Sequence, residues 1–375
     1  MIGKNYDLYT SKYDIKKIIN KQYSYQPTID SIVNETTIEY DDSPWHKDSL
    51  FHYQPTKFTK KTFTDSEVQK IYYPYHWRYG VPDANSGEED NMELLETANR
   101  IAIPVLQITE DSATGNHKSS VKNLYAALVN AKLAVNVIKT KQGSAASFED
   151  RISFNRYDTL GNLVEQQKTE DNKSSFIWDY KSSYPIAEVT NADSASIAYT
   201  SFEAEGKGNW SFSGAVSDTV CITGKKAYKF NGSNNISKAG LSSGSIYIVS
   251  YWSRNASAFS ITGSQSGYPI AGQTVNGWKY FEHKVTGQTT ITVGGTGWID
   301  ELRLYPDKAM MNTLTYTPLI GISSSCDANN RISYYEYDGF NRLTLVRNQD
   351  KNIVKESVTI MQDSQKIAAI ILILQ

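Results

Sequence analysis

Three acidic residues are the side chains of this sequence that are best suited to catalysis. Asp300 or Glu301 could act with Glu203 as the acid and the base of a glycoside hydrolase, because that reaction needs two carboxyl groups about 5 to 10 Å apart. Acidic residues beside strand ends are common, however, and no second motif supports this assignment. The sequence has no Gly-x-Ser-x-Gly elbow, no His-Glu-x-x-His pattern and no phosphate-binding glycine loop. We therefore expect a protein that is not an enzyme, and keep a carbohydrate-active hydrolase as the minor alternative.

The remaining reactive side chains give no pattern for a metal site or a nucleophile. The five histidines are scattered along the chain, at His46, His52, His76, His117 and His283. The two cysteines, Cys221 and Cys326, lack zinc-type spacing and are too few for a disulfide scaffold. Two free thiols are favoured, and a single disulfide stays open.

The composition predicts an all-β protein of more than one domain. A length of 375 residues exceeds one ordinary core and indicates two or three domains. With 39% hydrophobic and 21% charged residues, the chain is expected to fold. Tyrosine is unusually frequent at 26 residues, and 23 glycines accompany it. Because tyrosine favours strands and glycine favours turns, this bias indicates β-structure.

Charge and hydropathy limit the partners that can be expected. The formal net charge is -2, and no basic stripe interleaved with aromatic residues is present, so nucleic acid is not expected as a partner. No apolar run reaches the roughly 18 residues of a membrane span, and the first residues do not resemble a signal peptide. The plain inference is a cytoplasmic protein, and the alternative is a piece of a longer exported chain.

Residues 1–150 are expected to form a strand-rich region. Segments such as "TTIEYD" and "KFTKKTFT" alternate polar residues with β-branched and aromatic ones. Residues 120–141 fit either a helix or a pair of strands, and the strand pair is favoured because "LAVNVIKT" alternates. The acidic run at 87–96 is expected to be a solvated loop. The segment "YPYHWRYGVP" is expected to pack its rings rather than bind a partner.

Two segments, "YDTLGNL" (157–163) and "YDGFNRL" (337–343), repeat one short pattern. An aspartate at the head of a turn can accept hydrogen bonds from the backbone N–H groups that follow it. The third residue after Asp158 is Gly161, and the third after Asp338 is Asn341. Glycine and asparagine are the residues that best tolerate a left-handed backbone. Each segment therefore predicts a hairpin turn between two strands.

Both segments resemble the YD repeat of the RHS family, whose pattern is roughly Tyr-x-Tyr-Asp-x-x-Gly-Arg-Leu. The second copy, "YEYDGFNRL", has Arg342 and Leu343 in place, whereas Asn162 stands where arginine is usual in the first copy. The resemblance covers about 153–201 and 310–355. It implies a β-strand ribbon that, in longer relatives, winds into a hollow shell around cargo such as a toxin domain. Other segments of an RHS shell are then the expected partners, and the location is extracellular or at the cell surface. The alternative is a casing segment of a polymorphic-toxin delivery protein.

Between the two repeats, residues 200–306 are richer in glycine and serine and contain six candidate strands, which suits a β-sandwich. In order and spacing, this stretch resembles the galactose-binding-like, jelly-roll carbohydrate-binding modules, through "SFEAEGKGNWSFSG", "SGSIYIVSYWSRN", "NGWKYFEHKVTG" and "WIDELRLYP". The resemblance implies a glycan ligand and a structural calcium ion held by Glu203 and Asp300; oxygen ligands are those that calcium prefers. The alternative is that both acids are solvated or hold loop backbone.

A glycan site needs an aromatic platform and polar side chains that reach hydroxyl groups. Tyr268 and Trp278 lie beside Gly/Pro turns and are the best candidates for an exposed platform. Arg254 and Asn255 follow the long central strand and are the candidate hydrogen-bonding residues, with plain solvation as the default. Two other tryptophans are expected to pack in the core, namely Trp252 and Trp298.

The sequence thus predicts an all-β protein in which a jelly-roll β-sandwich is inserted between YD-repeat hairpins. Residues 1–150 form the strand-rich N-terminal region, and residues 151–199 the first YD-repeat unit. Residues 200–306 form the carbohydrate-binding-like sandwich. Residues 307–375 form a second YD-repeat unit, whose last part departs from the pattern.

Overall fold

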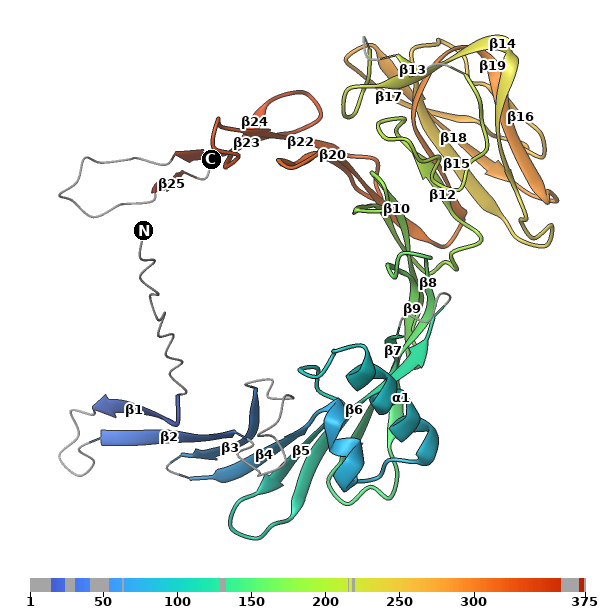
Figure 1. The fold of residues 1–375 in the computed structure, drawn as a ribbon. Coiled ribbons are helices and arrows are strands. Elements are labelled where there is room, and N and C mark those ends of the chain that lie inside the picture. Colours follow the sequence, from blue (N-terminus) through green and yellow to red (C-terminus); the bar gives the residue numbers. More distant parts are fainter. Residues whose placement is uncertain are drawn as a thin grey trace, which may run out of the picture. The chain divides into compact units, whose positions relative to one another are not determined.

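The structure is a computed structural model that describes residues 15–23, 31–40, 54–62, 64–128, 133–214, 216–217, 220–358 and 371–373. The chain divides into two compact units, Met1–Ser153 and Phe154–Gln375, which are coloured along the sequence in Figure 1. Strands account for 56% of the structure and helices for 6%. The all-β prediction is therefore confirmed, while the four-part division drawn from the sequence stays a prediction.

The N-terminal unit is an antiparallel meander in which each strand pairs with the next one along the chain. Its strands are β1 (Lys17–Tyr23), β2 (Ser31–Tyr40), β3 (Pro55–Lys61), β4 (Ser66–Tyr72), β5 (Leu106–Asp111), β6 (His117–Ala127), β7 (Leu133–Gln142) and the first part of β8 (Glu149–Tyr157), whose last four residues belong to the C-terminal unit. The pairing of β6 with β7 places Leu124 opposite Val137. The strand pair expected at residues 120–141 is therefore confirmed.

The acidic run at 87–96 lies in a helix, which corrects the expectation of a solvated loop. Helix α1 (Ser86–Thr97) begins after Asn85, whose side chain accepts a hydrogen bond from the backbone N–H of Glu88. Acidic residues in the first turn complement the helix dipole, and the asparagine cap satisfies a free N–H group. Met92 and Leu95, three positions apart, are buried in a cluster with side chains of β5 and β7. The run forms a helix because one of its faces is apolar.

The aromatic segment before this helix packs into the unit. It forms the 3-10 helix η2 (Pro74–Tyr79). Tyr73 and Tyr75 are buried, and their rings stack with centroids 6.3 Å apart. The packing interpretation is confirmed for these two rings, whereas Tyr79 is exposed.

The C-terminal unit contains a run of antiparallel strands, which we call the repeat sheet. Its strands pair in the order β9 (Leu163–Lys168), β10 (Lys173–Asp179), β11 (Tyr184–Thr190), β20 (Met310–Thr317), β21 (Gly321–Cys326), β22 (Ile332–Tyr337), β23 (Leu343–Arg347), β24 (Ile353–Val358) and β25 (Ile371–Ile373). Strands β11 and β20 are neighbours although more than a hundred residues separate them, and Thr190 lies opposite Met310. Residues 191–309, which we call the insert, therefore leave and rejoin the sheet at one hairpin end.

The two Tyr-Asp segments form turns built from the same hydrogen bonds. Oδ1 of Asp158 accepts bonds from the backbone N–H groups two and four residues later, at 2.9 and 2.8 Å. Asp338 accepts the corresponding bonds at 2.8 and 3.0 Å. Gly161 and Asn341 both have a left-handed backbone, with φ of 95° and 61°. The predicted hairpin turns are confirmed, including the left-handed role of the third residue.

The residue before the final leucine of the pattern also contacts the aspartate. Arg342 binds Oδ2 of Asp338 through Nε at 2.8 Å and Nη2 at 2.7 Å, and this contact lowers the pKa of the Asp338 carboxyl. In the first copy, Nδ2 of Asn162 donates to Oδ2 of Asp158 at 3.0 Å and to the carbonyl of Ser182 at 2.7 Å. Asparagine thus replaces the usual arginine with a similar contact that carries no charge.

Two further turns of this design were missed in the sequence. Asp327 and Asn348 each accept bonds from the N–H groups two and four residues later, at 2.8 Å in the first turn and 3.0 Å in the second. Asn330 and Lys351 occupy the left-handed position, with φ of 61° and 69°. The heads of the three successive turns, at 327, 338 and 348, are eleven and then ten residues apart. This part of the repeat sheet is a regular alternation of strand and turn.

A substitution at the left-handed position tests the backbone role of the turn. We expect Asn341→Val to lower the free energy of unfolding by about 1–2 kcal/mol, because a β-branched side chain is strained at positive φ. Asn341→Gly should change it by no more than about 0.5 kcal/mol, because glycine adopts this conformation without strain. Urea denaturation of the full chain measures both values. Equal stability of the two variants would show that this position does not impose a left-handed backbone.

The insert is an antiparallel β-sandwich (Figure 1), and a cluster of its buried side chains forms a core. Its strands are β12 (Ala198–Thr200), β13 (Val216–Ser217), β14 (Ala227–Ala239), β15 (Tyr247–Ser253), β16 (Ser260–Ile261), β17 (Ile270–Val275), β18 (Trp278–Val285) and β19 (Thr290–Pro306). The first half of β19 pairs with β14 and β16, and its second half pairs with β12 and β15. This long strand therefore runs through both layers. Phe202 and Leu304, from the two ends of the insert, are buried in one cluster.

Candidate functional site

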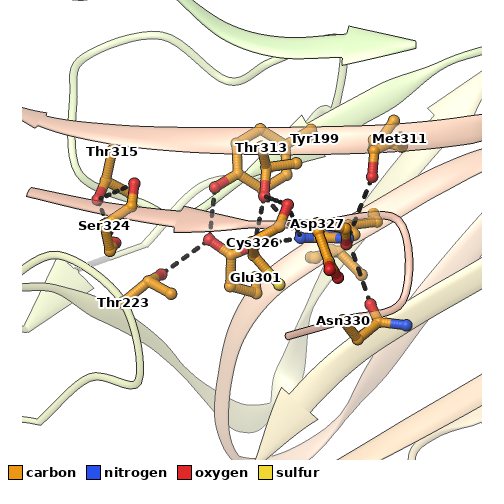
Figure 2. A network of polar contacts seen from close by, with 12 residues as sticks. Tyr199, Thr223, Glu301, Met311, Thr313, Thr315, Ser324, Cys326, Asp327 and Asn330 are labelled. Atoms are coloured by element: carbon orange, nitrogen blue, oxygen red, sulfur yellow. Dashed lines mark hydrogen bonds and ion pairs between the residues drawn. The ribbon is translucent and has the colours of Figure 1, made fainter. Parts of the chain in front are cut away.

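A network of buried polar side chains connects the insert to the repeat sheet. Glu301, on β19, has only 2% of its surface exposed. Its Oε1 atom accepts hydrogen bonds from Tyr199 at 2.5 Å and Thr223 at 2.8 Å, and its Oε2 atom accepts one from Thr313 of β20 at 2.9 Å. Figure 2 shows these side chains converging on the Glu301 carboxylate. We call this network the joint.

Arg303 provides the positive charge of the joint. Its side chain is 1% exposed, and Nη2 lies 3.2 Å from Oε2 of Glu301. The same guanidinium donates to the carbonyls of Cys326 at 3.1 Å and Asp327 at 3.0 Å, and to Oδ1 of Asn330 at 3.2 Å. These acceptors belong to β21 and to the turn that follows it. An ion pair of the insert is therefore completed by backbone groups of the repeat sheet, which is how a buried charge is satisfied.

The two acids predicted to share calcium both hold one loop of the insert. Both oxygens of Asp300 accept backbone N–H bonds, Oδ2 from Ile222 and Thr223 at 2.9 and 3.2 Å and Oδ1 from Glu301 at 2.7 Å. Oε1 of Glu203 accepts the N–H groups of residues 225 and 226 at 2.7 and 2.5 Å. Burial raises the pKa of both carboxyls.

This arrangement does not fit a calcium site well. N–H donors point at the oxygens of Asp300 that a cation would need, and N–H groups repel cations. Among the described residues, no group of three or more His, Cys, Asp or Glu side chains is arranged to hold a metal ion. The bonds observed are those of the alternative interpretation, in which both acids hold loop backbone. Calcium binding by Glu203 and Asp300 stays a prediction, and no step below depends on it.

Of the four residues predicted to bind a glycan, only Arg254 is exposed. Trp278 is only 3% exposed and packs in a cluster with Trp252, so its ring face is not available for stacking. Tyr268 is half-buried. Arg254 is exposed, and Nδ2 of Asn255 is bound to the carbonyl of residue 296 at 2.7 Å. Trp278 was predicted to be exposed because it lies beside a turn, and the structure shows that this exposure was wrongly predicted.

The core assignments of the other tryptophans agree with the structure. Trp252 is 1% exposed, and Trp298 is half-buried against the same cluster. Both cysteines are free thiols. Burial raises the pKa of Cys221 to about 11 and that of Cys326 to about 12. The favoured interpretation of two free thiols is therefore confirmed, and neither thiol is activated as a nucleophile.

A buried histidine makes the stability of the insert depend on pH. His283 is 1% exposed, contacts the hydroxyl groups of Tyr251 and Ser264 at 3.2 Å, and has its pKa lowered by burial to about 4. Between pH 6.5 and 4, this histidine is protonated in the unfolded chain but stays neutral in the folded chain. This residue should therefore lower the free energy of unfolding by about 3 kcal/mol as the pH falls through that range, with no effect above it.

The comparison with His283→Asn isolates this contribution. Urea denaturation at several pH values measures the difference in stability between the two proteins. That difference should be constant above pH 6.5 and should shrink as the pH falls to 4, because only the original protein loses stability through the histidine. A difference that stays constant down to pH 4 would mean that His283 is protonated in the folded chain.

Two cavities lie away from the joint. One, of about 420 Å³, lies under α1 and is lined by Met92, Leu95 and Lys122 among others; Lys122 is paired there with Glu88 at 2.9 Å. The other, of about 330 Å³, is more polar and lies where the first Tyr-Asp turn meets the first loop of the insert. Apart from Asp158, its lining residues were not singled out in the sequence.

Comparisons with known proteins give little guidance. No family model matches the sequence, and no curated protein matches it. Similar solved structures include the Photorhabdus luminescens Tc holotoxin pore with a mutation in TccC3, at 10% identity and a TM-score of 0.16. They also include TcdB2-TccC3 without its hypervariable C-terminal region and TcdB2-TccC3, both at 10% identity, with TM-scores of 0.20 and 0.19.

These matches cover 88% to 92% of this chain but only 14% to 23% of the other chains. TM-scores of this size are too low to establish a common fold. In the part of the chain that the structure describes, no helix has the length and apolar character needed to cross a membrane.

Proposed function

We propose that this chain is a non-enzymatic structural and interaction segment of an RHS/YD-repeat protein that acts outside the cell or at its surface. The observation that carries the proposal is the insertion of a β-sandwich at the hairpin end of β11 and β20, in a sheet whose turns share one Asp- or Asn-headed design. The repeat sheet is the scaffold, and the insert is the module that binds a glycan.

The joint supports a scaffold role. Glu301 and Arg303 of the insert are satisfied by Thr313 and by backbone carbonyls of the repeat sheet. Side chains of both parts also share a buried cluster that contains Ile248 and Met311. An insert attached through a packed and hydrogen-bonded surface is held in one orientation, as a binding module on a wall needs to be.

The engagement of the acidic residues supports the non-enzymatic part of the proposal. Asp300 and Glu301 are buried, and their oxygens accept bonds from the protein itself. A hydrolase needs two carboxyl groups that reach a glycosidic bond from opposite sides. The carboxylates that the sequence offered for this reaction are instead part of the structure of the joint and of the neighbouring loop.

A second candidate function is a casing segment of a toxin-delivery protein. It is favoured by the regular spacing of the turns at 327, 338 and 348, since a repeated strand and turn can extend a wall by adding further copies. Reading the flanking DNA for an in-frame continuation tests it. Further repeats followed by a variable C-terminal domain would support this candidate, and a stop codon with no continuation on either side would contradict it.

Screening the full chain on a glycan array, together with an assay on chromogenic glycosides, tests the principal proposal. We expect binding to at least one class of glycan in the micromolar to millimolar range and no release of the chromophore. Release of the chromophore would contradict the non-enzymatic assignment. An array without any bound glycan would contradict the binding function.

A further inference from the structure

The polar cavity of about 330 Å³ in the C-terminal unit has the features of a sugar site. It lies between the first Tyr-Asp turn, β10 and the first loop of the insert. Its volume is at the lower end of the range of about 300–1,000 Å³ for small-ligand sites and suits one or two sugar rings. All of the residues that line it belong to the C-terminal unit.

One wall of the cavity is aromatic. Phe176 and Trp178 are two positions apart on β10, so their side chains point to the same side of the sheet. Both are half-buried, whereas the three alternating residues of the other side are buried. The Trp178 ring is fixed by a hydrogen bond from Nε1 to the carbonyl of Leu163 at 2.7 Å. A fixed, partly exposed ring of this kind can stack against the apolar face of a sugar.

Two basic side chains in the cavity lack an acidic partner. Neither Arg156 nor Lys207 forms an ion pair with any residue that the structure describes. Arg156 uses Nη1 to bind the hydroxyl of Ser194 at 2.8 Å, and Lys207 lies over the ring of Phe212, 5.5 Å from its centroid. The remaining N–H donors of both side chains are available to an anion.

The acidic groups near the cavity are already engaged. Asp158, the one carboxylate that lines it, accepts two backbone N–H bonds and the amide of Asn162. Glu165, beside it, is paired with Lys173 at 3.2 Å and accepts bonds from Ser194. Among the lining residues, the two basic side chains of Arg156 and Lys207 outnumber the one carboxylate of Asp158, so the lining has a formal charge of +1.

Two glycines allow close contacts of the loop that borders the cavity, Gly206 with the repeat sheet and Gly208 with β12 of the insert. A Cβ atom at Gly206 would lie 2.4 Å from Oδ1 of Asp179, and one at Gly208 would lie 1.5 Å from the carbonyl oxygen of Tyr199. The loop also donates the N–H of Gly206 to Asp179 at 2.9 Å. Asn209 follows and donates Nδ2 to the carbonyl of residue 197 at 3.1 Å, which leaves its Oδ1 as an acceptor at the cavity.

We propose that this cavity binds a carboxylated sugar of the hexuronate class. The sugar ring stacks on Trp178, the carboxylate lies between Arg156 and Lys207, and a hydroxyl group donates to Oδ1 of Asn209. A carboxylate bound by arginine forms charge-assisted hydrogen bonds, which are stronger than neutral ones. The inference rests on the proposed glycan-binding function and adds the position and the chemical class of the ligand.

Titration of the full chain with two matched probes tests the inference. The probes are methyl β-D-glucuronide and methyl β-D-glucoside, which differ in the carboxylate, and ligand-observed NMR with isothermal calorimetry measures their affinity. We expect the glucuronide to bind at least about tenfold more tightly, since one charge-assisted bond contributes about 1.5 kcal/mol or more. Arg156→Gln and Lys207→Gln should each weaken the glucuronide about tenfold and leave the glucoside unchanged.

Lys225→Gln is the matched control, because this lysine is exposed and lies outside the cavity; it should not change either affinity. Equal affinity for the two sugars, or a glucuronide affinity that neither cavity variant lowers, would overturn the inference. Inorganic phosphate that competes as strongly as the glucuronide would overturn it too, since the cavity would then be a simple anion site. If the array shows bound glycans but the cavity variants bind them as the original protein does, the glycan-binding function stands and only this site is wrong. If no glycan on the array binds, the glycan-binding function itself is contradicted.

Discussion

Replacing Arg303 with methionine is expected to lower the free energy of unfolding of the C-terminal unit by about 3–5 kcal/mol. The substitution keeps most of the apolar volume but removes the only positive charge beside Glu301 among the described residues of the joint, where the two charged atoms are 3.2 Å apart. It also removes one hydrogen bond from each of the carbonyls of Cys326 and Asp327. Breaking a buried ion pair on one side is costly because an unpaired charge stays in the interior. Urea denaturation of the full chain measures the loss.

Arg347→Met is the matched control for this prediction. Arg347 is paired with Glu336 at 2.6 Å on the repeat sheet, but both side chains are partly exposed, so its replacement should cost less than about 1 kcal/mol. The double variant Glu301→Gln/Arg303→Met should be more stable than Arg303→Met alone, because it no longer buries an unpaired carboxylate. Equal losses for Arg303→Met and Arg347→Met would mean that the joint is not buried as described.

Replacing Trp252 with alanine should lower the free energy of unfolding by about 3–5 kcal/mol. The ring is 1% exposed and packs against Tyr280, and the same cluster includes Cys326 and Ile332 of the repeat sheet. Removing so large a buried side chain leaves a cavity in addition to the lost burial. Chemical denaturation followed by circular dichroism measures the change.

Trp252→Phe separates packing from hydrogen bonding at this position. The indole N–H of Trp252 is buried and has no partner among the described residues, so phenylalanine removes an unsatisfied donor while it keeps much of the apolar contact. The phenylalanine variant should therefore be clearly more stable than the alanine variant. A loss below about 1 kcal/mol for Trp252→Ala would contradict the core assignment and favour a surface position for this ring.

The turns of the repeat sheet could be predicted because their chemistry is local. Asp158 and Asp338 bond to N–H groups only two and four positions away, and a left-handed glycine or asparagine completes the turn. The turns at Asp327 and Asn348 were not predicted because no Tyr-Asp pair marks them in the sequence. The hydrogen bonds depend on the acceptor side chain at the head, which can be asparagine, and not on the tyrosine before it.

The sequence was misleading where distant residues decide burial. The turn beside Trp278 predicted exposure, but the side chain is buried in a cluster that also contains residues of β14, β15 and the repeat sheet. The acidic run in α1 contains the apolar residues Met92 and Leu95, whose spacing of three positions is typical of one face of a helix.

The joint could not be predicted from the sequence, because Glu301 meets partners 102 and 78 positions earlier, at Tyr199 and Thr223. A weak signal was present in "WIDELRLYP", where charged residues interrupt an otherwise apolar strand. The cavity lined by Arg156, Trp178 and Lys207 had no such signal, since these residues belong to three segments that meet only in the fold.

Disulfide trapping between β11 and β20 tests most directly whether the sandwich is inserted in a hairpin of the repeat sheet. Glu188 and Asn312 are exposed and lie opposite each other in register, at the Cα separation of about 4.5–5.5 Å that a disulfide needs. The native thiols, with pKa values raised to about 11 and 12, should stay out of the reaction. In Glu188→Cys/Asn312→Cys, mild oxidation of the folded chain should join most molecules, as read by mass spectrometry. The diagonal control, Glu188→Cys/Met310→Cys, should react much less. Failure of the first pair to form, or equal yields for both pairs, would contradict the insertion.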